Sequence, residues 1–213
     1  MVIDLFNTEQ SWRDLHRLYL SFVQPRPIAW VSSISRDGRP NLAPFSFYNM
    51  VSANPPVVLF SPALNRAGDA KDTLANVRET GEFVVATVTE HNARAMNDTS
   101  TEFPRGVNEF EMAGLTALPA TRVRPALVKE SPVNIECRLR QIIQLGVENG
   151  AGNVIMGDVL VIHVYDDVLA PDGTCDPDKL LAIGRMGGSL YARTRDRLEM
   201  VSIRDPSKLP PRR

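Results

Sequence analysis

Histidine and cysteine are scarce in this sequence of 213 residues, and their scarcity argues against several kinds of site. The three histidines, His16, His91 and His163, lie far apart and lack the spacing of metal ligands, so no metal site is expected. The two cysteines, Cys137 and Cys175, form no CxxC pair. They predict no disulfide framework and suit a reducing compartment.

Several motifs and segment types are also missing. The sequence contains no GxGxxG after a first strand, no GxxxxGKS or GxxxxGKT, no GxSxG and no HExxH. It has no apolar run near the ~18 residues that a membrane span needs. The opening residues MVIDLFNTEQ lack the basic stretch and apolar run of a secretory signal. With a formal net charge of −1, we expect a cytoplasmic protein that binds neither nucleic acid nor a membrane.

The remaining composition is that of a globular protein, with 43% hydrophobic and 23% charged residues. The hydrophobic periodicity predicts five to seven mostly antiparallel strands and two or three helices, which favours a closed or nearly closed β-barrel. We expect one domain over residues 1–213. It would comprise a helical lead-in at 1–22, an excursion over the barrel at 99–132 and a basic tail at 198–213, either solvated or able to dock an anion.

Residues 133–140 show the alternation of a strand with one buried face. Val133, Ile135, Cys137 and Leu139 form the apolar set, which predicts a core position for the Cys137 thiol. The intervening polar residues are expected on exposed strand faces. The same expectation applies to a wider set: Glu82, Asn134, Glu136 and Asp158.

A first candidate site lies in the segment SPALNRAGDAKDTLANV, residues 61–77. A helix is predicted to begin near Asp72 or Thr73, and a helix N-terminus favours a phosphate. Ser61, Arg66 and Lys71 would complete such a site, together with the Thr73 hydroxyl. The alternative is a capped surface helix with Asp72 as N-cap and Lys71 in solvent.

A second candidate site lies in the hairpin predicted at residues 25–49, whose turn contains Asp37-Gly38. Pro44 predicts a strand edge or bulge where regular pairing fails and backbone groups are free for a ligand. Ser46 and Asn49 add polar side chains. Flat apolar surface would come from Trp30, Phe45, Phe47 and Tyr48. This mixture suits a planar heteroaromatic ligand, and with the phosphate site it predicts one cofactor of the shape of flavin mononucleotide (FMN).

Four blocks in the sequence resemble the flavin-reductase-like family, whose members have an FMN-binding split barrel. They are RPIAWVSSISRDGRPNLAPFSFYNMVSANPPVVLFS, KDTLANVRETGEFVV, NEFEMAGLTALPATRVRPALVKESPVNIEC and GRMGGSLYAR. The resemblance implies a mainly β, antiparallel split barrel with a few helices. It spans roughly residues 20–197, and the blocks occur in the order that the family shows.

The resemblance also assigns cofactor contacts. Against the flavin ring it places Arg26, Pro27, Trp30, Ser32, Ala43, Pro44, Phe45, Ser46, Phe47 and Asn49. Around the phosphate it places Ser61, Arg66, Lys71, Asp72 and Thr73. His163 would adjust the flavin by hydrogen bonding or charge, unless it is a structural strand histidine. Arg185 and Tyr191 would shape the cofactor pocket, unless GRMGGSLYAR is a glycine-rich turn with Tyr191 covering the core.

The function implied by the resemblance is that of an NAD(P)H-dependent flavin reductase. FMN would be the cofactor, with FAD as the alternative, and NADH or NADPH would donate the hydride. The flavin would carry the chemistry without a catalytic residue from the protein. We expect a homodimer with flavin near the interface and a monooxygenase or electron-transfer partner. A flavoredoxin-like electron carrier and a non-catalytic flavin-binding barrel remain alternatives.

Overall fold

The computed structural model describes residues 2–5 and 9–201; most of the predicted basic tail, from residue 202 onward, lies outside this part. The helices are α1 (Trp12–Phe22), α2 (Asp72–Thr80), α3 (Ala93–Asp98), α4 (Glu109–Met112) and α5 (Pro177–Leu180), with a 3-10 turn at Asp166–Val168. The strands are β1 (Ala29–Ile34), β2 (Pro40–Phe45), β3 (Tyr48–Ala53), β4 (Pro56–Phe60), β5 (Glu82–Thr87), β6 (Ala117–Leu118), β7 (Leu127–Val128), β8 (Val133–Gln144), β9 (Asn153–Val164), β10 (Ile183–Arg185) and β11 (Tyr191–Arg193).

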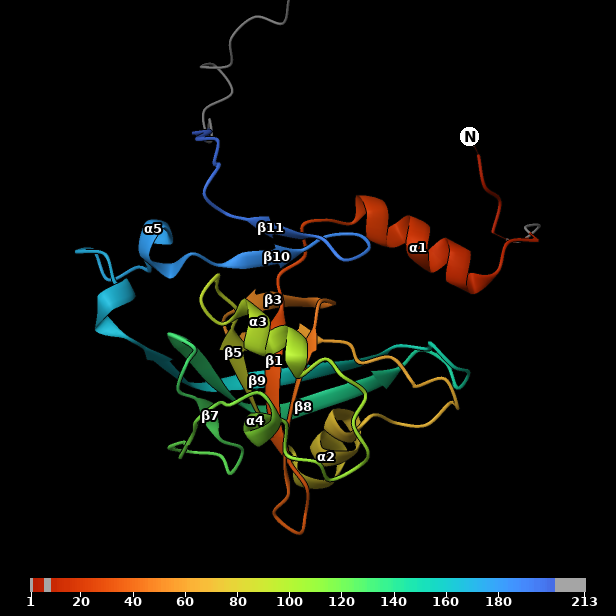
Figure 1. Cartoon of the computed structure of the whole chain (residues 1–213), viewed down its shortest axis with the longest axis horizontal. Helices are drawn as coiled ribbons and strands as arrows, with labels where there is room; N and C mark the ends of the chain where they lie inside the picture. Colours follow the sequence, from red (N-terminus) through yellow and green to blue (C-terminus); the bar gives the residue numbers. More distant parts are fainter. Residues whose placement is uncertain (1, 6–8, 202–213) are drawn as a thin grey trace, which may run out of the picture.

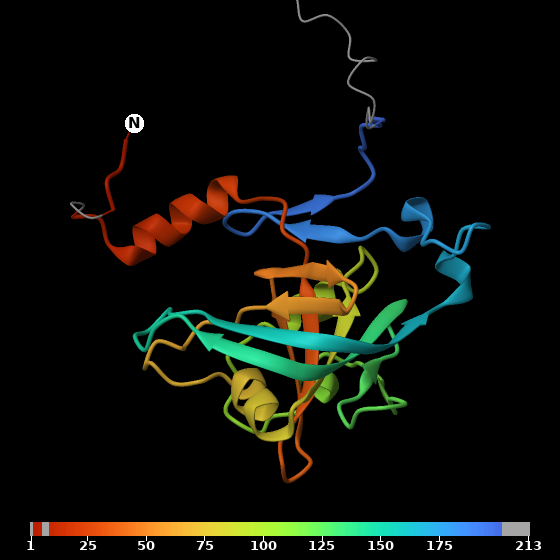
Figure 2. The same cartoon turned by 180° about the vertical axis from the view of Figure 1, so that it is seen from behind.

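Seven strands form one antiparallel sheet in the order β2-β1-β5-β8-β9-β4-β3 (Figures 1 and 2). The two edge strands, β2 and β3, follow one another in the chain and are joined by Ser46 and Phe47. The sheet therefore curls on itself, but hydrogen bonds between its edges do not close it. The predicted β1–β2 hairpin is confirmed, with Gly38 at φ 89° in its turn.

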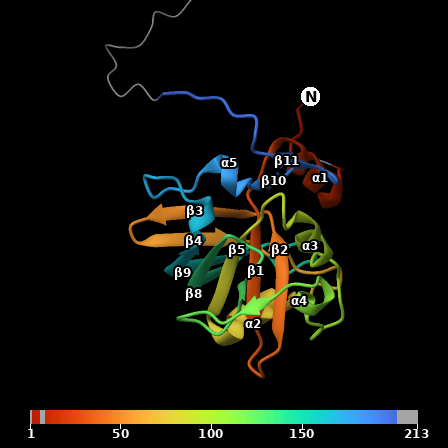
Figure 3. The same ribbon diagram turned by 60° about the vertical axis from the view of Figure 1, so that its left-hand side comes forward.

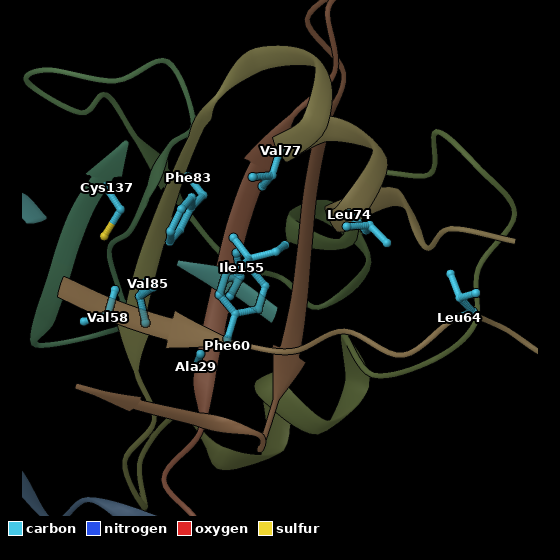
Figure 4. Close-up of a cluster of buried hydrophobic side chains, with 11 residues drawn as sticks. Ala29, Val58, Phe60, Leu64, Leu74, Val77, Phe83, Val85, Cys137 and Ile155 are labelled. Carbon is cyan, nitrogen blue, oxygen red and sulfur yellow. The ribbon is translucent and has the colours of Figure 1, made fainter. Parts of the chain in front are cut away.

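The main hydrophobic core fills the inside of the curl. Figure 4 shows Phe60 of β4 and Phe83 of β5 with their rings in contact, at a centroid separation of 5.3 Å. Leu74 and Val77 of α2 close one side of this core. Cys137 is fully buried there, as predicted, and burial raises the pKa of its thiol well above the ordinary value.

A second core lies on the other face of β1, β2 and β5. Trp30 and Leu42 pack there against Met96 of α3 and Phe110 of α4. The chain between α4 and β8 carries the short β6–β7 hairpin, and Val123 and Leu127 from this region pack on Val84 of β5. Both faces of this part of the sheet are therefore covered.

Helix α1 and the β10–β11 hairpin lie side by side at one end of the molecule, whereas α2 lies at the opposite end (Figures 1 and 3). The predicted lead-in helix is confirmed, and the Ser11 side chain caps it by accepting from the Asp14 N–H at 3.2 Å. Gly81 ends α2 in the left-handed conformation, which glycine adopts readily. No helix in the described ranges is both long and apolar enough to span a bilayer.

Gly157 of β9 lies between the neighbouring strands β4 and β8, close to the Phe83 ring of the main core. A Cβ atom at this position would overlap the Phe83 ring, and the β8–β9 register shifts between Leu139 and Gln141, next to it. A glycine in the middle of a strand is typical of a bulge or of a close approach by a neighbouring group. The extra residue of the register shift is Arg140 of β8, next to the Leu139–Gly157 pair, and the close neighbour of Gly157 is the aromatic side chain of Phe83.

Candidate functional site

Pro44 lies in β2, at the edge of the sheet, as its missing N–H group predicts. The Leu42 N–H points away from β1 and donates to Glu109 Oε2 at 3.0 Å. Backbone N–H groups alternate in direction along an antiparallel strand, so the nitrogen of Pro44, two residues further on, also faces outward. The expected loss of regular pairing is wrong, because the register with β1 continues unbroken from Pro40 to Phe45.

The chain leaves this ladder at Ser46 and Phe47, between the two open edges of the sheet. The Phe47 carbonyl accepts the Ser61 N–H at 2.9 Å. This contact joins the predicted ring-binding stretch, residues 44–49 (the ring stretch), to Ser61. Ser61 is the first residue of the predicted phosphate-binding loop, residues 61–71 (the phosphate loop). The Leu42 N–H is occupied by Glu109 and is therefore not free for a ligand, whereas Phe47 and Asn49, further along the chain, are exposed.

Arg26 organises this stretch from the opposite side. Its buried guanidinium donates to Ser46 Oγ at 3.3 Å and to the carbonyls of Leu20, Val23 and Met186 at 3.2, 2.5 and 3.0 Å. Burial, followed by the nearby Arg185 charge, lowers the pKa of Arg26. One side chain therefore links the end of α1, the β2–β3 connection and the β10–β11 hairpin.

Two predicted ring contacts are corrected by the structure. Trp30 and Ser32 are fully buried on the second core's side of β1, where Trp30 Nε1 donates to Thr99 Oγ1 at 2.9 Å. Ser32 Oγ finds no hydrogen-bond partner among the described residues. Side chains alternate between faces along a strand, so a set of neighbouring residues cannot all reach one ligand.

The other predicted ring residues differ in exposure. Phe45 points to the main core, where its ring lies 5.3 Å from that of Phe60, while Phe47 is exposed and meets His16 of α1 edge-on. Asn49 Oδ1 accepts the N–H of Met50 at 2.9 Å. Intermediate exposure is shared by Ala43, Pro44 and Ser46, and Pro27 is exposed beside Arg26.

The predicted phosphate residues fall into two groups. Arg66 and Lys71 are exposed on the loop before α2, and Lys71 is the N-cap without a side-chain cap bond. The first N–H groups of α2 are therefore available to an anion. Asp72 instead forms an ion pair with Arg105, with 3.6 Å between Asp72 Oδ1 and Arg105 Nε. The buried Thr73 hydroxyl accepts a hydrogen bond from Asn41 Nδ2 at 2.9 Å.

A buried polar network that the sequence analysis missed holds Thr73 in place. Asn41 Nδ2 also contacts Ser33 Oγ at 3.1 Å, and Asn76 Nδ2 donates to the same oxygen at 3.1 Å. Thr73 is therefore a positioning residue for the start of α2. In the sequence, Asn76 could have indicated this network, because it is a polar residue one turn after Thr73 and lies on the same face of the helix.

His163 lies in a second network that contradicts the expected strand faces. Its Nε2 lies 2.6 Å from Oε1 of Glu136, which is fully buried and also accepts the backbone N–H groups of Thr121, Arg122 and Val123 at 2.8, 2.6 and 3.1 Å. Asn134 is buried as well and bonds to Val128. The predicted exposure of Asn134 and Glu136 is wrong because the chain before β8 covers this face.

His163 and the phosphate loop lie at opposite ends of β9. The Asn153 N–H donates to the Pro62 carbonyl at 3.0 Å. His163 is ten residues further along the same strand, which corresponds to roughly 30 Å at about 3.3 Å per residue. This separation places His163 far from a flavin held at this chain's own phosphate loop, so the predicted role would require a flavin bound by a second copy of the chain.

Arg185 and Tyr191 are cross-strand partners in the β10–β11 hairpin. The Arg185 guanidinium lies 4.6 Å from the centre of the Tyr191 ring. The backbone of Arg185 pairs with Arg26 through hydrogen bonds of 3.0 and 2.8 Å, which places this hairpin next to the ring stretch. No cluster of three or more potential metal ligands occurs within residues 2–5 and 9–201.

Comparison with known proteins identifies the family of this site. Residues 23–185 match the model of the flavin reductase like domain. The chain belongs to the flavin-reductase-like family. It is 42% identical to an uncharacterized protein of Aquifex aeolicus, over 84% of this chain and 89% of that one.

Two solved structures are similar over nearly their whole length. Component B of nitrilotriacetate monooxygenase from Bacillus cereus superposes with a TM-score of 0.87 and 33% identity, covering 94% of this chain and 98% of that one. The 2-nitrobenzoate 2-nitroreductase of Pseudomonas fluorescens superposes with a TM-score of 0.85 and 27% identity, covering 99% of this chain and 99% of that one. The predicted family and split barrel are confirmed, and membership of this family indicates a flavin-related redox function.

Proposed function

We propose that this protein binds FMN at residues 44–49 and at the loop before α2, and passes reducing equivalents to it from NADH or NADPH. FAD is the alternative cofactor. The observation that carries the proposal is the bond from the Ser61 N–H to the Phe47 carbonyl, which brings the two predicted parts of one flavin site together. Neither part alone would distinguish a cofactor site from an ordinary strand edge or surface helix.

The residues present fit a flavin with a phosphate tail. The Arg26–Ser46 contact fixes the path of the chain at the ring stretch, and exposed Phe47 offers apolar surface. Arg66, Lys71 and the uncapped start of α2 provide positive charge for the phosphate. A bound flavin would supply the hydride chemistry, while these residues bind and orient it.

Anaerobic mixing with NADH or NADPH tests the proposed activity. We expect the protein loaded with FMN to lose its visible flavin absorbance with at least one of the two nucleotides. Dithionite serves as the control for a reducible flavin. If dithionite bleaches the flavin but neither nucleotide does, the protein is an electron carrier or a flavin-binding barrel and the reductase proposal is wrong.

Replacing Lys71 by alanine tests the phosphate end of the site. We expect FMN affinity to fall by about tenfold, because a charge-assisted contact is lost, while riboflavin affinity stays unchanged. Fluorescence titration with both flavins measures the difference. Lys129→Ala removes another exposed lysine as the matched control; equal weakening of both flavins by Lys71→Ala would remove Lys71 from the phosphate site.

A homodimer is part of the proposal, supported by apolar side chains exposed on the sheet. Met50 of β3 and Ile162 of β9 are 64% and 58% exposed, and Phe22 of α1 is also exposed. Large apolar side chains left exposed to solvent are the kind of surface that a second copy of the chain could cover. Sedimentation as a monomer at micromolar concentration would contradict it.

We further infer that the reduced flavin serves a monooxygenase partner in the cytoplasm. The similarity to component B of nitrilotriacetate monooxygenase, at 33% identity over 94% of the chain, supports this partner class.

A further inference from the structure

A hollow of about 550 Å³ lies beside the C-terminal hairpin. It is separate from residues 44–49 and the loop before α2, where FMN is proposed to bind, although Tyr191 belongs to its lining. Its lining consists of Glu90, Ala93, Ile183, Tyr191 and Arg193. The volume falls within the range that small-molecule sites occupy. The connection between β5 and α3 and the start of α3 form one wall, and β10 and β11 form the other.

The uncharged lining of this hollow suits a flat apolar body. Ile183 and Ala93 contribute aliphatic surface, and Tyr191 contributes an aromatic ring. Arg185 lies 4.6 Å from the centre of that ring, and the Tyr191 hydroxyl lies 3.4 Å from Asn97 Oδ1. These contacts from β10 and α3 hold the ring as a fixed wall.

Two guanidinium groups, those of Arg193 and Arg195, contact the single carboxylate of Glu90 at this hollow. Arg195 holds Glu90 through both carboxylate oxygens, at 2.7 and 3.0 Å. Arg193 meets Glu90 through a single nitrogen at 3.3 Å, and its side chain is 75% exposed. Arg193 can therefore turn to an anion while Glu90 stays paired with Arg195.

We propose that this hollow binds an aromatic ring that carries an anionic group, with the ring against Tyr191 and the anion on Arg193. Two sources share this chemistry. One is the phosphate-bearing adenosine end of a nicotinamide donor. This source rests on the proposed function, and it is sterically reasonable because the backbone of Arg185 pairs with Arg26, which places the hairpin next to residues 44–49. The other is a small free aromatic carboxylate.

Isothermal titration calorimetry on the full chain saturated with FMN tests the proposal. The probes form two pairs that differ in the anion: adenosine 2′-phosphate with adenosine, and benzoate with benzyl alcohol. We expect the anionic member of one pair to bind about tenfold more tightly than its neutral counterpart, because it gains a charge-assisted hydrogen bond. The pair that shows this preference identifies the source.

Arg193→Gln should abolish that preference, since glutamine retains hydrogen bonding but loses the charge. Arg140→Gln is the matched control, because Arg140 is an exposed arginine of β8 paired with Asp158. Equal binding of charged and neutral probes, or an unchanged preference in Arg193→Gln, would overturn the proposal. Failure of FMN to saturate the protein when the samples are prepared would count against the proposed function instead, because the preference for an anionic probe is measured separately from flavin binding.

Discussion

Replacing Glu136 by alanine is expected to lower the free energy of unfolding by about 4 kcal/mol, because three backbone N–H groups and His163 lose their shared acceptor. Glu136 is fully buried and fastens the chain at residues 121–123 onto β8. Urea denaturation at neutral pH measures the change. Loss of the Glu136 side chain should also loosen the small core around Val123, visible as faster amide hydrogen exchange there.

The matched control is Glu130→Ala. Glu130 also accepts a backbone N–H from the chain before β8: its two carboxylate oxygens lie 3.0 and 3.1 Å from the Thr116 nitrogen. Unlike Glu136, Glu130 is exposed. Its loss should cost less than about 1 kcal/mol, because water can replace it. Equal destabilisation by the two substitutions would show that burial of Glu136 is not what makes it important.

The contribution of Glu136 should also depend on pH. Burial alone would raise the pKa of this carboxyl, but the hydrogen bonds from His163, Thr121 and Arg122 outweigh burial and hold the pKa below the ordinary value of 4.5. A group with a lowered folded-state pKa stabilises the protein above its unfolded-state pKa and loses that contribution as pH falls through the folded-state pKa. The stability difference between wild type and Glu136→Ala should therefore narrow in acid and be largest near neutrality.

Replacing Arg26 by alanine is expected to weaken FMN binding by about a hundredfold and to cost about 2 kcal/mol of stability. The substitution removes the donors that hold Ser46, the end of α1 and Met186 together. The ring stretch then loses its fixed path, which a ligand would have to restore on binding. Flavin titration and thermal unfolding measure the two effects.

Arg26→Lys should recover only part of both losses, because an ammonium group cannot replace a guanidinium fork that reaches several acceptors at once. Arg17→Ala, at an exposed arginine of α1, is the control and should leave FMN binding unchanged. If Arg26→Ala binds FMN as tightly as wild type, residues 44–49 do not depend on Arg26 for their conformation.

Local chemistry made much of the fold predictable. The missing N–H group of Pro44 indicated an edge strand, and Gly81 marked the end of α2. The alternation around Cys137 indicated its buried face. Each of these features depends on a backbone property or a periodicity that neighbouring residues already display.

The expected site was less predictable, because a strand has two faces and the sequence does not say what covers each. Trp30 and Ser32 alternate with Ala29 and Val31, and only the structure shows the second core that buries them. Thr73 was expected at the phosphate, but its hydroxyl is held by Asn41 from another strand.

Sequence alone predicted the β1–β2 hairpin, the strand that starts at Val133, the edge position of Pro44, the helix that begins near Asp72 and the resemblance to the flavin-reductase-like family. These depend on local chemistry and on the order of short motifs along the chain. Tertiary structure decided that Glu136 is buried, that Phe47 meets Ser61 and that Arg193 faces a hollow beside Tyr191. Those outcomes depend on which distant segment covers a given face, and local periodicity carries no information about that choice.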